Sequence, residues 1–131
     1  MIVLDTHCWL WWASDPERLS SRARATIDQA VEDGTVYISA ISTWEIAMLV
    51  SVGRLELTME VADWVAKFDA LPFVHFVPVD NHVAIRSVHL PRPFHSDPAD
   101  RIIVATAVIV GATLITKDEK IRGYRGVKSV W

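Results

Sequence analysis

The chain has little cysteine and no excess of basic charge, and each shortage excludes a class of protein. Cys8 is the only cysteine, so no internal disulfide forms, which is usual in a reducing compartment. Lys and Arg total 13 against 16 Asp and Glu, which gives a formal net charge of −3. Broad, non-specific nucleic-acid binding relies on an excess of cations and is disfavoured. A nuclease that meets phosphate through metal ions and a few local cations stays compatible with this charge.

Long apolar runs and targeting segments are also missing. The longest uncharged stretch, residues 102–116, is shorter than a membrane-spanning helix requires and is interrupted by Thr106 and Gly111. Residues 1–4 lead directly to Asp5 without a basic start or a cleavage site, so we expect no signal peptide. These absences predict a soluble, cytoplasmic protein that has no membrane partner.

The composition is that of a folded domain. Hydrophobic residues make up 51% of the 131 residues and charged residues 22%, which is enough for a substantial core and too little polarity for disorder. No Ser/Gly tract, charge block, Pro-rich linker or internal repeat divides the chain. We therefore predict a single domain over residues 1–131.

Short apolar runs alternate with helical patterns along the chain. Strands are expected at residues 2–4, 36–38, 74–79, 113–116 and 127–131, and helices at 20–34, 42–53, 59–70, 81–90 and 97–111. Ser20 is placed to cap the first of these helices and Gly34 to end it. The tryptophan-rich run of residues 9–12 is expected in the core or at a subunit interface. The alternation predicts an α/β fold with a parallel sheet flanked by helices.

Four acidic residues lie at boundaries between these elements: Asp5, Glu45, Asp100 and Asp118. Ligands of parallel sheets bind beyond the carboxyl ends of the strands, where Asp5 and Asp118 are expected. Carboxylates gathered in one crevice repel one another unless a cation lies between them. An all-oxygen set of ligands favours Mg²⁺ or Mn²⁺, so the pattern predicts a divalent-metal site.

Each acid also has a simpler explanation. Ser42 and Glu45 have the spacing of a capping box at a helix N-terminus. Asp97 is placed to cap the helix in which Asp100 occupies the third position. Asp118 alone is typical of a surface turn. Metal binding and capping are compatible, because a helix N-terminus favours an ionised carboxylate.

Several short motifs, in this order, resemble the PIN-domain ribonucleases, and most closely the VapC toxins of type II toxin–antitoxin systems. The motifs are Leu4-Asp5-Thr6-His7, Ser39-Ala40-Ile41-Ser42-Thr43-Trp44-Glu45-Ile46-Ala47, Gly53-Arg54-Leu55, Asp97-Pro98-Ala99-Asp100-Arg101 and Thr116-Lys117-Asp118. The resemblance covers essentially the whole chain. Leu49 and Ala99 depart from the commonest family pattern, where many relatives carry Lys and Phe, but neither change removes an acid.

This resemblance implies a PIN-like fold with a central parallel sheet of about five strands, and a metal-dependent endoribonuclease activity. It assigns catalytic positions to Asp5, Glu45, Asp100 and Asp118. Asp5 and Asp100 would be the principal ligands of Mg²⁺, with Mn²⁺ as a possible substitute. The family match adds possible supporting or substrate-contacting residues, namely Thr6, Asp97, Arg101 and Thr116. Asp97 rivals Asp100 for part of the metal-binding role.

The resemblance also implies three partners: an RNA substrate, a cognate antitoxin protein and a second copy of the chain in a homodimer. A different class of function stays open from the residues alone. The domain would then be a catalytically weak interaction module, with the acids acting as caps. The six tryptophans of this small chain make apolar binding surfaces plausible.

Overall fold

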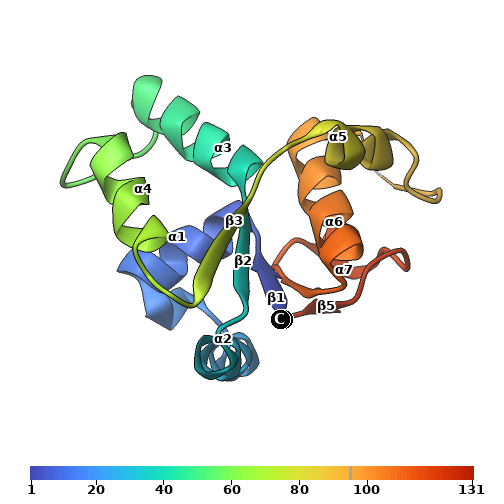
Figure 1. Ribbon diagram of the computed structural model, residues 1–131, viewed down its shortest axis with the longest axis horizontal. Coiled ribbons are helices and arrows are strands. Elements are labelled where there is room, and N and C mark those ends of the chain that lie inside the picture. The colour runs from blue at the N-terminus through green and yellow to red at the C-terminus, as the bar shows by residue number, and fades with distance from the viewer. Residues whose placement is uncertain (95) are drawn as a thin grey trace.

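The short apolar runs form a five-stranded sheet in the computed structural model, which describes residues 1–94 and 96–131 (Figure 1). Its strands are β1 (Ile2–Leu4), β2 (Val36–Ser39), β3 (Val74–Val77), β4 (Thr113–Ile115) and β5 (Ser129–Val130). They pair in the order β3-β2-β1-β4-β5, and every pair is parallel. The predicted α/β fold with about five parallel strands is confirmed. His95 lies outside the described residues.

The strand order reverses direction beside β1. The chain passes from β1 outward to β2 and β3, and then returns to place β4 on the other side of β1. Leu4 is therefore paired with Ile38 on one side and with Ile115 on the other. Such a reversal opens a crevice beyond the carboxyl ends of the two strands that flank it. In this protein those strands are β1 and β4.

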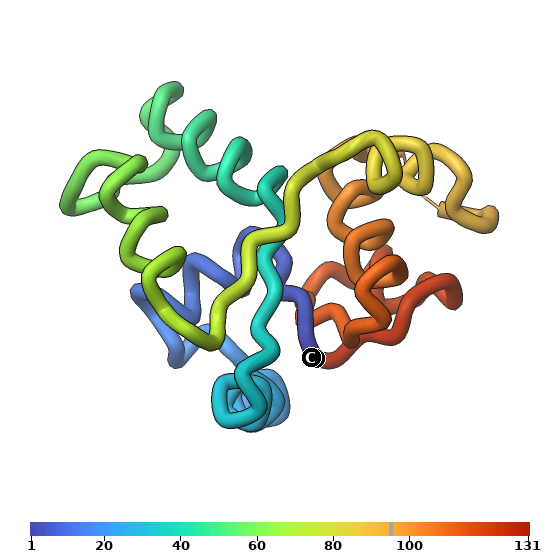
Figure 2. The backbone as a smooth tube through the Cα atoms, in the orientation of Figure 1, coloured from blue at the N-terminus to red at the C-terminus, as the bar shows by residue number. Residues whose placement is uncertain are grey.

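Helices cover both faces of the sheet (Figures 1 and 2). They are α1 (Thr6–Ser14), the 3₁₀ turn η1 (Pro16–Arg18), α2 (Ser21–Asp33), α3 (Ala40–Ser51), α4 (Val61–Asp69), α5 (Asn81–Val88), α6 (Pro98–Val110) and α7 (Glu119–Arg122). Helices α1, α2 and α4 pack on one face, whereas α5 and α6 pack on the other. Within the described ranges, every helix is too short or too polar to cross a membrane.

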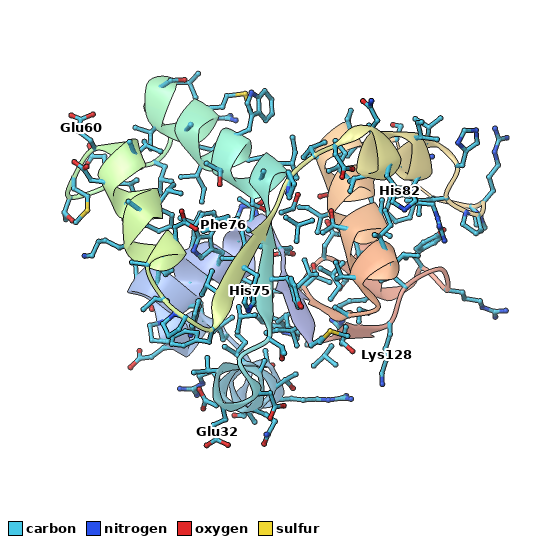
Figure 3. All side chains as sticks on the ribbon, viewed as in Figure 1. Glu32, Glu60, His75, Phe76, His82 and Lys128 are labelled. Atoms are coloured by element: carbon cyan, nitrogen blue, oxygen red, sulfur yellow. The ribbon has the colours of Figure 1, made fainter. Side chains whose placement is uncertain are left out.

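The alternation of side chains along each strand divides the core between the two faces. Ile2 and Leu4 belong to the cluster under α1, α2 and α4, whereas Val3 between them belongs to the cluster under α5 and α6. Charged side chains such as Glu32, Glu60 and Lys128 lie at the periphery (Figure 3). All three residues of β1 are buried, as expected for a central parallel strand.

The tryptophan-rich run lies on a helix that the sequence analysis did not predict. Helix α1 begins directly after Asp5, whose side chain accepts a hydrogen bond from the Cys8 N–H at 2.8 Å. Apolar residues at four consecutive positions hide the helical period, which explains the omission. Trp9 is fully buried, as expected for core packing, whereas Trp11 and Trp12 are half-buried.

The capping box predicted at Ser42 and Glu45 is wrong. Helix α3 begins at Ala40, immediately after β2, and its cap is Ser39, whose hydroxyl accepts from the Ile41 N–H at 3.2 Å. Glu45 therefore lies beyond the first turn, and its side chain is not committed to a cap. In contrast, the expected caps at Ser20 and Gly34 are present on α2.

Trp9 anchors the first core, so its truncation should destabilise the protein strongly. Its ring centroid lies 4.9 Å from that of Trp64, 5.5 Å from Phe68 and 5.6 Å from Phe76. We expect Trp9→Ala to lower the free energy of unfolding by about 3–5 kcal/mol in urea denaturation. Trp44→Ala removes a side chain that is 55% exposed and should change it by less than about 0.5 kcal/mol. Equal losses in the two variants would contradict this account of the core.

Candidate active site

Asp5 and Thr116 meet where β1 and β4 end. Each residue directly follows its strand, and the Asp5 N–H donates to the Ile115 carbonyl at 3.1 Å. The buried Thr116 hydroxyl donates a hydrogen bond to Asp5 Oδ2, while Asp5 Oδ1 accepts from the Cys8 N–H. Asp5 is only 9% exposed, so these two donors hold a carboxylate that would otherwise be costly to bury.

Thr116 also positions the next acid along the chain. Its hydroxyl oxygen accepts from the Asp118 N–H at 3.1 Å. Asp118 then caps the short helix α7, with Oδ1 accepting from the Lys120 N–H at 2.8 Å and the Ile121 N–H at 3.3 Å. The turn role expected for Asp118 is therefore present. One hydroxyl connects a buried acid to a solvent-exposed acid.

Glu45 reaches the same region from α3. Its Oε1 accepts a hydrogen bond from the Thr6 hydroxyl at 2.6 Å, and Thr6 Oγ1 also lies 2.9 Å from Ser42 Oγ within hydrogen-bonding distance. Desolvation raises the pKa of Glu45, the Thr6 hydrogen bond opposes that increase, and the charge of Asp97 adds to it. Thr6 thus joins the start of α1 to the carboxylate of α3.

Asp97 and Asp100 come from the N-terminus of α6. Asp97 is the N-cap, and its Oδ1 accepts from the Asp100 N–H at 3.0 Å, as the sequence predicts. Burial raises the pKa of Asp100 to about 7, and the charges of neighbouring carboxylates add to the increase. In decreasing order, these neighbours are Asp97, Asp118, Glu45 and Asp5. Acidic residues that are far apart in the sequence thus form one cluster of carboxylates that repel one another.

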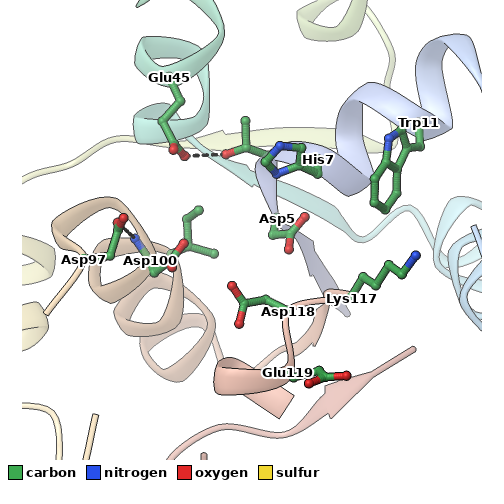
Figure 4. A pocket seen from close by; sticks show the side chains of 11 residues that line it. Asp5, His7, Trp11, Glu45, Asp97, Asp100, Lys117, Asp118 and Glu119 are labelled. Atoms are coloured by element: carbon green, nitrogen blue, oxygen red, sulfur yellow. Dashed lines mark hydrogen bonds between the residues drawn. The ribbon is translucent and has the colours of Figure 1, made fainter. Parts of the chain in front are cut away.

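These carboxylates surround one pocket of about 590 Å³ (Figure 4). Its lining consists of Asp5, Thr6, His7, Trp11, Glu45, Asp97, Asp100, Ile103, Lys117, Asp118 and Glu119. All four predicted acids are therefore brought together with their rival Asp97. The sequence analysis did not find Trp11 or Glu119. Helices α1 and α7 place these two side chains at the pocket, and no sequence motif indicated that position.

Arg101 is engaged elsewhere. Its Nε donates to the Ser87 carbonyl at 3.0 Å, and its guanidinium lies 5.7 Å from the ring centroid of Phe94. These contacts join α6 to the end of α5, and Arg101 does not line the acidic pocket. The geometry favours a packing role over the predicted substrate contact.

The donor set suits a hard divalent cation that keeps much of its water. Carboxylate oxygens are the ligands that Mg²⁺ and Mn²⁺ prefer. As the side chains stand, no three His, Cys, Asp or Glu residues in the described ranges form a group that could hold one ion. Mg²⁺ is usually held by one or two carboxylates together with water. The residues present therefore fit a largely hydrated ion better than a closed protein cage.

Comparison with known proteins identifies relatives of similar sequence and similar fold. Ribonuclease VapC22 of Mycobacterium tuberculosis (strain ATCC 25618 / H37Rv) is 37% identical over 98% of this chain and 95% of its own length. The structure of VapBC2 from Rickettsia felis, bound to a DNA fragment from its promoter, matches with a TM-score of 0.72 at 15% identity, covering 99% of this chain and 98% of that chain. A toxin–antitoxin complex from Klebsiella pneumoniae matches with a TM-score of 0.64 at 23% identity, covering 100% and 97%.

At these identities, the two structures demonstrate a shared fold. The family model named PIN domain matches residues 2–127, which is nearly the whole chain. Together with the relative from Mycobacterium tuberculosis, this match establishes the family. The chain therefore belongs to the PIN-domain family.

Proposed function

We propose that this protein is a Mg²⁺-dependent endoribonuclease that hydrolyses RNA phosphodiesters as the toxin of a type II toxin–antitoxin module in the cytoplasm. The observation that carries the proposal is the group of six carboxylates around one pocket at the ends of β1 and β4. A relative that is 37% identical and bears the name ribonuclease supports the reaction class. Mn²⁺ is the expected substitute for Mg²⁺.

Asp5 and Asp100 are the residues proposed to hold the metal. Glu45 and Asp118 complete the site directly or through water. When bound, a divalent cation would polarise the scissile phosphate and lower the pKa of an attacking water molecule. Burial is the main cause of the raised pKa of Asp100, and the cation would also relieve the repulsion from neighbouring carboxylates that adds to it.

The hydrogen bonds on Asp5 prepare it for this role. Thr116 donates to one carboxylate oxygen and the Cys8 N–H to the other, so both oxygens are held in place. A carboxylate has about four lone-pair sites, so both oxygens retain acceptor capacity toward the pocket. Thr6 acts similarly on Glu45, because its hydroxyl fixes one oxygen of that side chain.

The proposed protein partners are a cognate antitoxin and a second copy of this chain. The Klebsiella pneumoniae structure, which shares the fold, is a toxin–antitoxin complex. Trp44 and Met48 on α3, and Val52 at its C-cap, are 55%, 41% and 62% exposed, and their spacing of four places them on one side of the helix. This apolar stripe favours a protein interface.

The same stripe supports the alternative of a catalytically weak interaction module. Titration calorimetry distinguishes the two functions. The module is favoured if the purified protein binds neither Mg²⁺ nor Mn²⁺ and cleaves no RNA. The nuclease is favoured if the protein binds metal and cleaves RNA, and if substitution of a pocket carboxylate removes both properties together.

Removing one charge from either principal metal ligand should abolish cleavage. We expect Asp5→Asn and Asp100→Asn to reduce Mg²⁺-dependent cleavage of cellular RNA by more than the ~100-fold typical of outer supporting residues. Asn is an effective N-cap, so Asp5→Asn should retain α1 and the fold. The matched control Asp28→Asn changes an exposed acid on α2 and should keep full activity. Retained activity in both pocket variants would overturn the metal site.

Thr116 should act as a positioning residue for Asp5. Thr116→Val keeps the shape but removes both the donor to Asp5 and the acceptor for the Asp118 N–H. We expect Mg²⁺ affinity, measured by calorimetry, and cleavage rate each to fall about 10–100-fold. Thr116→Ser should restore most of both. Equal defects in the Val and Ser variants would show that packing, rather than the hydroxyl, is responsible.

Without metal, the acidic group should make stability depend on pH. The folded-state pKa of Asp100, about 7, exceeds its ordinary value of 3.8, so the folded state binds the proton more tightly than the unfolded state. Stability should therefore fall as pH rises from about 4 to 7 and then level off. In EDTA, Asp100→Asn should raise the Tm by a few degrees relative to the parent at pH 8 and by much less at pH 4. A difference that is the same at both pH values would contradict the cause assigned here.

A further inference from the structure

A pair of tryptophans with cations beside it lies next to the acidic pocket. The ring centroids of Trp11, on α1, and Trp131, after β5, are 5.9 Å apart at an interplanar angle of 61°. Lys117 Nζ lies 6.0 Å from the first centroid and 5.9 Å from the second. The Arg18 guanidinium lies 5.0 Å from the Trp11 centroid. Aromatic faces and positive charge are thus combined at one edge of the site.

The tryptophans join two hollows. Trp11 lines the acidic pocket, and Figure 4 shows it beside His7 with the Lys117 side chain extending toward it. Trp131 lines a second hollow of about 380 Å³, together with Arg22, Glu119, Arg122, Gly123 and Ser129. Glu119 lines both hollows. The two hollows therefore adjoin at Glu119, and each is lined by one indole of the pair, with two guanidinium groups in the second hollow.

This surface can offset the electrostatic repulsion of RNA by the acidic pocket. The carboxylates of the pocket repel the phosphates of any RNA, and the chain has a net charge of −3. The surface around the two tryptophans presents four cations. They are Arg18 on η1, Arg22 on α2, Lys117 before α7, and Arg122 on α7. Single-stranded nucleic acid is held by such cations on its phosphates and by aromatic rings on its bases.

The indoles are also held firmly. Both are half-buried and pack against the core cluster under α1, α2 and α4. A ring fixed in this way loses little conformational freedom when a base stacks on it. Packing alone would explain the burial of the tryptophans, but it would not require a cation beside each ring or guanidinium groups in the adjoining hollow.

We propose that single-stranded RNA adjacent to the scissile phosphate crosses the Trp11–Trp131 pair and places its next phosphates against Arg22 and Arg122. This inference rests on the proposed ribonuclease function and extends it, because it assigns the side on which the strand leaves the acidic pocket. Arg18 and Lys117 support the rings and contribute positive charge along the path.

The test measures binding of a fluorescent oligouridine of about 15 nucleotides in EDTA, by anisotropy over a series of salt concentrations. We expect Arg22→Gln with Arg122→Gln to weaken binding about tenfold at low salt and to reduce the slope of log affinity against log salt by about 1.4. Each single-strand phosphate contact contributes about 0.7 to that slope. The matched control, Arg24→Gln with Arg125→Gln, removes two exposed charges from outside the hollow and should leave the slope unchanged.

A second pair of variants tests the rings. Trp131→Ala should weaken oligouridine binding about tenfold, and Trp131→Phe should restore most of it, because stacking requires an aromatic face. Thermal unfolding confirms that each variant is folded. The proposal is overturned if both arginine pairs weaken binding equally, or if Trp131→Phe is no better than Trp131→Ala. It is also overturned if the variants leave oligouridine binding intact and instead weaken self-association in sedimentation.

Cleavage is scored separately, so that the two proposals can fail independently. Mg²⁺-dependent digestion of cellular RNA by the parent protein tests the ribonuclease. If the parent binds oligouridine through Arg22 and Arg122 but cleaves nothing, the surface stands and the nuclease fails. If the parent cleaves RNA but the variants bind oligouridine as it does, the nuclease stands and this surface is excluded.

Discussion

The hydrogen bond from Thr116 to Asp5 is the interaction on which the site depends. It joins the ends of β1 and β4, the two strands between which the sheet reverses its order. On one side, Asp5 begins α1 by accepting from the Cys8 N–H. On the other, Thr116 accepts from the Asp118 N–H, and Asp118 begins α7. A single side-chain contact therefore sets two helix starts and the position of two acids.

The cost of this arrangement is electrostatic. Burial and the neighbouring carboxylates raise the pKa of both Glu45 and Asp100, so the metal-free site disfavours its own ionised form. The two hydrophobic cores lie on opposite faces of the sheet, whereas the acids line a pocket at the ends of β1 and β4. A site that is unfavourable without a ligand is one that a cation can stabilise, and this reasoning links the fold to the proposed metal.

Local patterns predicted the features that depend on neighbouring residues. The buried run before Asp5, the Asp97 cap and the Gly34 helix end all follow from short-range chemistry. Prediction failed where tertiary contacts or competing local signals decide. Ser39 rather than Ser42 caps α3, because the helix starts as soon as β2 ends and Ser39 is the first residue able to cap it. The convergence of the acids was inferred from sheet topology and the family resemblance, since spacing alone places no two of them together.

The surface around Trp131 could not be predicted from the sequence either, because tertiary contacts form it. Its partners come from α1, α2 and α7, and no spacing in the chain connects them. Net charge was equally uninformative, because it averages over distances longer than those at which charges act. With a Debye length of about 8 Å at physiological ionic strength, a phosphate beside Arg22 and Arg122 responds mainly to charges nearby. A chain that is acidic as a whole can therefore attract RNA along one side, while its pocket holds the carboxylates that we propose bind a metal ion.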